Sequence, residues 1–169
     1  MNRFSPTSET HPPRFLFRVE CHDQSSRYYN CSFTNFHMTA RFPTRIVNES
    51  AFRDHFSWSH TPTPFLSFSN DWNKALARRR WMLDNGAKDI VLIAVETRDL
   101  RNVYNAYDVA RCLGYTDNTR NRRRRLSKHC GEFLVVGGIH ADEYRIIATF
   151  PGDGPERLVS LSIPKSYSP

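Results

Sequence analysis

Two serines at alternating positions are the first residues in the sequence that could take part in chemistry. Ser67 and Ser69 lie within the apolar segment Phe65–Ser69, which is typical of a buried strand, and alternate residues of a strand leave the same face. Asp71 follows as a residue type that caps helices, and Trp72–Leu83 has helical spacing. Two hydroxyls beside the positive end of a helix are therefore a candidate site, although an ordinary polar strand face has the same pattern.

Two charged residues stand at the ends of other apolar segments. Arg18 follows Phe15-Leu16-Phe17, and Glu132 precedes Phe133–Val136. An arginine can bind phosphate oxygens through forked hydrogen bonds, and a glutamate can stabilise a developing positive charge. Taken singly, each of these residues is equally well explained as the solvated end of a strand.

The order of these segments resembles a known signature. FLFRV, then FLSFS before a helix, then GEFLV, resembles the arginine, serine-x-serine and glutamate pattern of the ADP-ribosyltransferase fold. TPFLSFSNDWNKAL, NAYDVARCLG and EFLVVGGIHADEYRIIATFPG also resemble segments of an uncharacterised fungal domain family of that general kind. The resemblance spans about Pro13 to Pro155. It implies a split, mostly antiparallel sheet with NAD as the substrate in its cleft and no metal.

The resemblance also implies roles for individual residues. Arg18 would bind the pyrophosphate of NAD, and Ser67 would hold the glutamate and the nicotinamide ribose. Ser69 would be the second serine of the pattern, and structural. Glu132 would accept a hydrogen bond from the ribose and stabilise the cation formed as nicotinamide leaves, as in glycoside cleavage. Phe68 stands where the family commonly has a small residue, and it either borders the cofactor site or fills the core.

The acceptor of the ADP-ribose is not indicated by the sequence. Two positions before the glutamate, the family usually carries a glutamate or glutamine that helps to bind the acceptor, and this chain has Cys130. Arginine modification is therefore disfavoured. The preceding segment, Tyr115–Cys130, is expected to be an exposed loop, and its arginines could bind phosphates of a nucleic acid acceptor: Arg122, Arg123, Arg124 and Arg125. A solubilising loop or a nuclear-import signal explains these arginines equally well.

Composition limits the classes of protein that remain. The chain has 169 residues and a net charge of +7, which favours anionic partners such as nucleotides or nucleic acid. No run approaches the roughly 18 apolar residues of a membrane span, and the first residues lack the apolar core of a signal peptide, so we expect an intracellular protein, cytoplasmic or nuclear. Its four cysteines form no C-x-x-C pair, so we expect no metal site.

The order of the expected elements predicts an α+β fold. Strands come first, helices lie in the middle and strands come last, without strict alternation. We expect one domain over residues 13–165 after a flexible segment at 1–12. Two further helices are expected, one from an Asn48 cap to Trp58 and one to Leu113 capped by Asn102 or Asn105. Three further strands are expected: a central strand at Ile90–Val95, a strand at Glu143–Phe150 and an edge strand over Val159–Ile163. A hairpin or a short excursion over Gly137–Asp142 would lead to the second of these strands.

Two functions from different classes follow. The first is an ADP-ribosyltransferase that cleaves the nicotinamide–ribose bond of NAD and transfers ADP-ribose to a protein, a nucleic acid or water. The second is an inactive module of the same fold that binds nucleic acid or an acidic protein through its basic loop. The net charge and the cysteine at position 130 favour the second; the ordered arginine, serine and glutamate favour the first.

Overall fold

The fold is known from a computed structural model, which describes residues 4, 6, 13–23, 31–34, 37–57, 61–121, 125–140, 142–150 and 157–158. Expectations for residues 1–12, apart from 4 and 6, for Arg122, Arg123 and Arg124, and for the edge strand at Val159–Ile163 lie outside the described residues. Within the described part of the chain, no helix has the length and apolar composition needed to span a bilayer.

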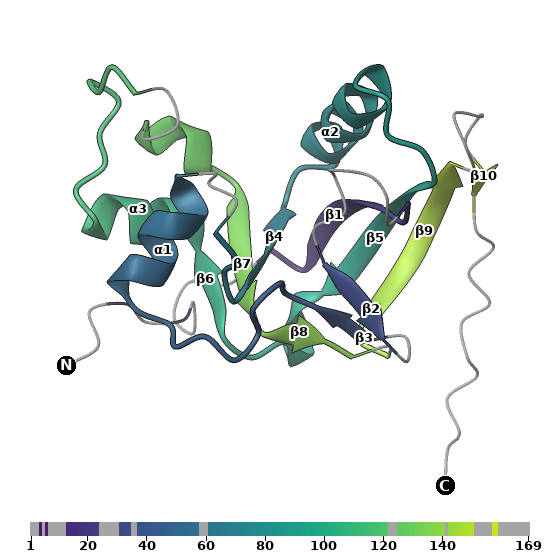
Figure 1. The fold of residues 1–169 in the computed structure, drawn as a ribbon, viewed down its shortest axis with the longest axis horizontal. Helices are drawn as coiled ribbons and strands as arrows, with labels where there is room; N and C mark the ends of the chain where they lie inside the picture. The colour runs from purple at the N-terminus through teal and green to yellow at the C-terminus, as the bar shows by residue number, and fades with distance from the viewer. Residues whose placement is uncertain are drawn as a thin grey trace, which may run out of the picture.

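A seven-stranded sheet forms the centre of the molecule (Figure 1). Its strand order is β10-β9-β5-β1-β4-β7-β6, and every neighbouring pair is antiparallel. This confirms an α+β fold with a mostly antiparallel sheet. The strands are β1 (Phe15–Cys21), β4 (Phe65–Ser69), β5 (Ile90–Glu96), β6 (Val103–Asn105), β7 (Glu132–Val136), β9 (Tyr144–Phe150) and β10 (Arg157–Leu158).

The apolar run at Ile90–Val95 is a central strand, as predicted, because β5 pairs with β1 on one side and β9 on the other. The hairpin alternative for Gly137–Asp142 is wrong, since β7 and β9 are far apart in the strand order. The excursion alternative is correct. It contains β8 (Gly138–Ile139), which joins β2 (Ser32–Thr34) and β3 (His37–Thr39) in a second, three-stranded sheet.

The helices begin where side-chain caps predict. Asn48 caps α1 (Glu49–Phe56), which ends two residues before the expected Trp58, Asp71 caps α2 (Trp72–Asp84), and Asn105 caps α3 (Ala106–Cys112). Gly86, after α2, has a φ of +84°, the left-handed conformation that a glycine adopts without strain. Two short 3-10 turns, η1 (Thr97–Asp99) and η3 (Leu126–His129), complete the helical elements that concern the site.

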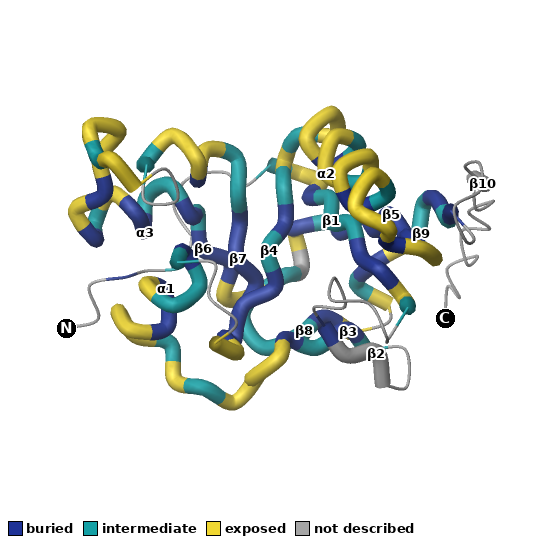
Figure 2. The backbone as a smooth tube through the Cα atoms, turned by 45° about the horizontal axis from the view of Figure 1, so that its top comes forward, coloured by how far each residue is buried: buried dark blue, intermediate teal, exposed yellow. Residues whose placement is uncertain are grey.

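All three helices lie on one face of the large sheet. α1 and α3 cover Phe65 and Leu134, and α2 covers Ile90 and Leu92 at the other end of the sheet (Figures 1 and 2). The three-stranded sheet packs on the opposite face through Met38. Among the described residues, α1 and α3 thus cover one end of this face and α2 covers the other.

The large sheet divides between β1 and β4. Seven residue pairs join β1 to β5 and five join β4 to β7, but the single pair Phe17–Ser69 joins β1 to β4. Next to this pair, where the backbone hydrogen bonds between β1 and β4 stop, Nη1 of Arg18 donates to the Ser67 carbonyl oxygen at 2.5 Å. An inserted guanidinium thus satisfies a carbonyl next to the division of the sheet.

Arg18 is a buried ion rather than a solvated strand end. Its side chain is 11% exposed, and Nη2 contacts the carboxylate of Glu20, whose side chain is 1% exposed. Burial raises the pKa of Glu20 above its ordinary value although Arg18 opposes the shift. Burial, together with the charge of Glu20, also raises the pKa of the nearby Cys31 thiol to about 12. A charged pair therefore lies between the two sheets beside a thiol that stays protonated.

Replacing Arg18 by methionine should lower the free energy of unfolding by about 3–5 kcal/mol, because Glu20 is left buried without its counter-charge. Denaturant titration measures this loss. Removing both charges with Arg18→Met and Glu20→Met should restore part of it, since no unpaired ion remains.

The matched control is Arg14→Met, which breaks the ion pair with Glu96 at 3.2 Å, where the Arg14 side chain is 77% exposed. An exposed pair contributes at most about 1 kcal/mol. Equal losses for Arg14→Met and Arg18→Met would show that the buried pair has no special part in the fold.

Candidate active site

The centre of the site is a hydrogen bond between neighbouring strands. β4 and β7 are antiparallel, Ser69 stands opposite Glu132, and Ser67 lies two residues away on the same face. The Ser67 hydroxyl donates to Glu132 Oε1 at 2.5 Å. Two of the residues that the sequence identified, 65 positions apart, are therefore in direct contact.

Two histidines hold the same carboxylate from the helical side. His129 in η3 contacts Glu132 Oε2 through Nδ1 at 3.2 Å, and His55 in α1 directs Nε2 at Oε1 from 3.7 Å. Three elements besides β7 therefore converge on one side chain. The Glu132 side chain nevertheless stays 21% exposed, so an external group can reach it.

The orientation of His129 is fixed by an apolar environment. The residue is fully buried, its ring centroid lies 4.3 Å from that of Phe56 and 5.9 Å from that of Tyr115. Among the described residues, Nε2 has no hydrogen-bond partner. The proton of the imidazole is therefore best placed on Nδ1, where Glu132 accepts it.

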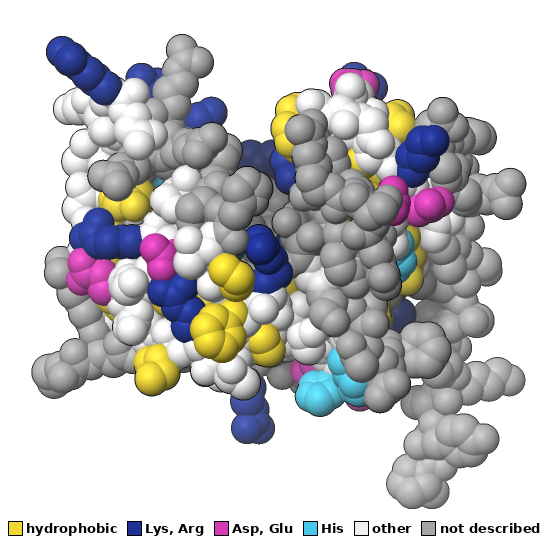
Figure 3. Space-filling view, viewed as in Figure 1, with side chains coloured by type: hydrophobic (Ala, Val, Ile, Leu, Met, Phe, Trp, Pro, Cys, Tyr) yellow, Lys and Arg dark blue, Asp and Glu magenta, His cyan; other side chains and the backbone are white. Residues whose placement is uncertain are grey.

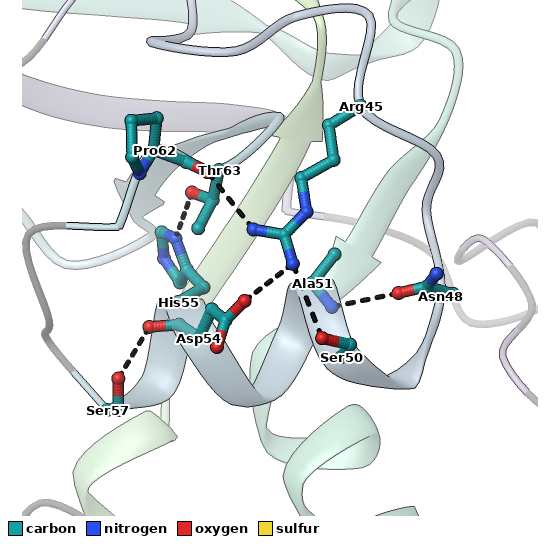
Figure 4. A network of polar contacts seen from close by, with 9 residues as sticks. All are labelled: Arg45, Asn48, Ser50, Ala51, Asp54, His55, Ser57, Pro62 and Thr63. Carbon is teal, nitrogen blue, oxygen red and sulfur yellow. Dashed lines mark hydrogen bonds and ion pairs between the residues drawn. The ribbon is translucent and has the colours of Figure 1, made fainter.

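His55 is held from its other nitrogen. Its Nδ1 lies 3.1 Å from the Thr63 hydroxyl (Figure 4). Its Nε2 faces the Glu132 carboxylate. Because an N–H is favoured next to an anion, we assign the proton to Nε2 and the donor role to Thr63. Arg45 fastens this segment to α1, since it binds the Asp54 carboxylate at 2.5 Å and the Pro62 carbonyl at 3.1 Å.

These contacts set the charge of the site. Burial alone would raise the pKa of Glu132, but hydrogen bonds from His129, His55 and Ser67 outweigh it, so the pKa lies well below its ordinary value. Glu132 is thus an anion at neutral pH. A fixed anion of this kind can accept a hydrogen bond from a ligand hydroxyl and stabilise positive charge.

The arrangement differs from that of a serine hydrolase. Nucleophilic activation needs a base that takes the proton of the hydroxyl, and that base is usually a histidine. Here the Ser67 hydroxyl donates its hydrogen bond to the Glu132 carboxylate, which is a weak base because its pKa is lowered. Over the described ranges, no group of three His, Cys, Asp or Glu side chains could hold a metal ion. A fixed anion with a lowered pKa is suited to electrostatic stabilisation of positive charge.

Arg18 approaches the site from the other face of the sheet. Its guanidinium lies 5.7 Å from the ring centroid of Phe68, which is 2% exposed and belongs to the core under the small sheet. Arg18 therefore supports the backbone of Ser67 from behind, with two of its nitrogens engaged by Ser67 and Glu20. Phe68 fills the core, one of the two alternatives for it.

Ser69 and Cys130 border the site without joining the hydrogen bonds to Glu132. The Ser69 hydroxyl accepts from the backbone N–H of Asp71 at 3.1 Å and so helps to begin α2, the structural role expected for it. Cys130 is exposed, and its carbonyl oxygen accepts from Lys74 Nζ at 2.8 Å. This contact fastens α2 to the turn before β7.

The segment Tyr115–Cys130 is only partly the exposed loop that was predicted. The loop was predicted for the RNRRRRLSK core, whose Ser127 and Lys128 are exposed, but Leu126–His129 forms a 3-10 turn, and His129 after the core is buried. Arg125 donates to the Thr119 carbonyl oxygen at 3.4 Å and is thus not part of the group around Glu132.

Sequence reasoning did not assign His55, Thr63 or Glu20 to the site. A signal for His55 was present, because Phe52 and Phe56 mark the buried face of the helix capped by Asn48 and His55 flanks that face. Glu20 follows Arg18 at the spacing of one strand face, which could have indicated a pair.

A family model described as "Domain of unknown function (DUF7587)" matches residues 11–152. No curated protein matches the chain.

The lowered pKa of Glu132 predicts a specific acid sensitivity. A carboxylate whose pKa is lowered by folding stabilises the folded state. This contribution is fully present above its unfolded pKa of about 4.3 and is lost as the pH falls towards its folded pKa. The difference in unfolding free energy between the wild type and Glu132→Gln should therefore shrink below about pH 4.3, by about 1.4 kcal/mol per pH unit.

Denaturant titrations at pH 7 and pH 3.5 measure this difference. Glu49→Gln, on the outer side of α1 with its side chain 48% exposed, controls for the exchange of a carboxylate for an amide. A difference that is the same at both pH values would contradict the network around Glu132.

Proposed function

Since the chain belongs to the DUF7587 family, whose description names no activity, we propose its function from its own site: an ADP-ribosyltransferase that cleaves NAD. The bond between nicotinamide and ribose breaks with its electron pair going to nicotinamide. A nucleophile of a macromolecule, or water, then bonds to the ribose carbon and loses a proton. The finer fold assignment, an ADP-ribosyltransferase-like split sheet, belongs to the same proposal.

The observation that carries the proposal is the ionised Glu132 carboxylate, bound to Ser67 at 2.5 Å and still partly exposed. Departure of nicotinamide leaves positive charge on the ribose, as in the cationic transition state of glycoside cleavage. A carboxylate whose charge and orientation are set before the reaction stabilises that cation without reorganisation.

The hydrogen bonds at Glu132 leave a defined place for the substrate. A carboxylate has about four lone-pair positions. Ser67 and His55 face Oε1, and His129 faces Oε2. The His55 contact, at 3.7 Å, is longer than a hydrogen bond, so lone-pair positions on the carboxylate stay available and one of them suits a ribose hydroxyl. Ser67 and the histidines are then positioning residues, and Glu132 is the residue that contacts the reacting sugar.

The surroundings of the carboxylate also suit a dinucleotide. Phe17 stands opposite Ser69 on the same face, and the Trp72 ring meets it edge-on at 5.3 Å. Trp72 is partly exposed, so an apolar surface borders the polar site. In Figure 3 the outline of the molecule is notched between the part that carries α3 and the part that carries α2. The net charge of +7 favours approach of a ligand with two phosphates.

Cys130 limits which group could accept the ADP-ribose. It is exposed two residues before Glu132, at the position where the resembling transferases carry a glutamate or glutamine for the acceptor. A thiol can neither accept two hydrogen bonds from a guanidinium nor neutralise its charge. We therefore propose an acceptor other than arginine: another protein side chain, a nucleic acid, or water.

The test is release of nicotinamide from NAD by the purified chain. Glu132→Gln should lower kcat by about 10²–10³, the usual effect of losing one well-placed electrostatic group. Ser67→Ala should lower it by about 10- to 100-fold, the worth of a hydrogen bond to a charged group. Both variants should bind NAD with little change, because the interaction develops as the bond breaks.

Glu49→Gln is again the matched control and should keep the wild-type rate. Equal rates for Glu132→Gln and the wild type would remove Glu132 from the mechanism. A folded wild-type protein that releases no nicotinamide would contradict the enzyme and favour the alternative, a non-catalytic binding module.

A further inference from the structure

The outer side of α2 carries a stripe of residues that the proposed reaction does not use. Lys74, Arg78 and Trp81 are spaced i, i+4 and i+7, so they lie on one side of the helix, and all three are exposed. Figure 2 shows the outer side of α2 as exposed along its length. We call these three residues the α2 stripe.

The stripe is strongly basic for a helix. α2 holds four basic side chains and one acidic one, Asp84. Arg79 is turned inward, with its guanidinium 4.0 Å from the ring centroid of Phe150. The other three cations, Lys74, Arg78 and Arg80, are exposed, and Lys74 and Arg78 belong to the stripe. A helix with this excess of positive charge favours anionic ligands.

The stripe also carries an exposed flat surface. Trp81 is 45% exposed, an unusual position for so large an apolar side chain, and the Arg78 guanidinium lies 4.4 Å from its ring centroid. An indole beside a guanidinium can stack on a nucleobase, because both groups are planar and both interact with π faces. An acidic peptide would use the charges but not this surface.

The stripe begins at the candidate active site. Lys74 Nζ donates to the Cys130 carbonyl oxygen at 2.8 Å, and the backbone N–H of Asn70 donates to the Gly131 carbonyl oxygen at 3.0 Å. Cys130 and Gly131 directly precede Glu132. The helix is thus fastened to the turn that carries the carboxylate, and the remaining donors of Lys74 can bind a ligand.

We propose that the α2 stripe binds single-stranded nucleic acid. Phosphates bind Lys74 and Arg78, and a base stacks on the surface formed by Arg78 and Trp81. A single strand is the form that fits, because its bases are free to stack on side chains whereas those of a duplex are stacked on one another. This binding does not depend on cleavage of NAD.

Fluorescence anisotropy of a labelled twelve-nucleotide single strand, titrated with the full chain at several salt concentrations, tests the proposal. Two phosphate contacts give a slope of log K against log salt of about −1.4. Arg78→Glu should make that slope shallower by about 0.7 and weaken binding. Trp81→Ala should weaken binding about fivefold or more while leaving the slope unchanged.

Two substitutions elsewhere are matched controls. Arg41→Glu makes the same change in net charge at an exposed position after β3, and Phe42→Ala removes an aromatic ring that is 47% exposed. Both should leave affinity within about twofold of the wild type. Thermal unfolding of each variant shows whether it is folded.

Four outcomes would overturn the proposal. They are no binding by the wild type, equal effects of Arg78→Glu and Arg41→Glu, a duplex that binds as tightly as the single strand, and binding that the α2 variants leave unchanged because the arginines at 122–125 bind instead. Polyglutamate that competes equally, with no effect of Trp81→Ala, would replace nucleic acid by an acidic protein. The nicotinamide assay fails or succeeds separately from each of these outcomes.

Discussion

The insertion of Arg18 between β1 and β4 is the interaction on which the rest of the structure depends. A backbone carbonyl at the division of a sheet needs a donor, and the Arg18 guanidinium supplies one to Ser67 while Glu20 neutralises its charge. Burying this pair costs desolvation energy that an apolar pair would not require. What the pair provides instead is a fixed position for β4 where ladder bonds to β1 end. Because β4 is fixed there, the Ser67 hydroxyl on its other face is fixed too, and it orients Glu132 through their hydrogen bond.

Glu132 combines two properties that usually oppose one another. Burial disfavours a charged carboxylate, yet its pKa is lowered because donors from β4, α1 and η3 outweigh the desolvation. Each donor is itself held in place: His129 by the rings of Phe56 and Tyr115, and His55 by Thr63. The carboxylate therefore keeps one orientation without being closed off from solvent. A group arranged in this way is suited to stabilising a transient cation and poorly suited to acting as a base, since its affinity for protons is low.

Much of this arrangement was predictable from local patterns, and the rest depends on contacts between distant segments. The Ser67–Ser69 strand, the helix caps at Asn48 and Asp71 and the buried run at Ile90–Val95 follow from alternation, capping chemistry and apolar continuity. Glu132 was identified by its place in a pattern. The burial of His129 was not predictable, because the surrounding sequence is among the most polar in the chain and the rings that cover it, Phe56 and Tyr115, belong to other segments. The second sheet escaped prediction for a related reason, since strands of two or three residues are too short to show a period.

The attachment of α2 makes the carboxylate and the basic stripe parts of one unit. Lys74 and Asn70 bind the turn at Cys130 and Gly131, so the helix cannot move without moving the residues just before Glu132. The positive potential along the helix has a range of about 8–10 Å at physiological salt, which reaches the site face. That potential attracts any polyphosphate, and the carboxylate at its edge repels one locally. A negatively charged ligand is thus drawn to α2 and held off Glu132, unless it presents a hydroxyl or a positive charge at that point.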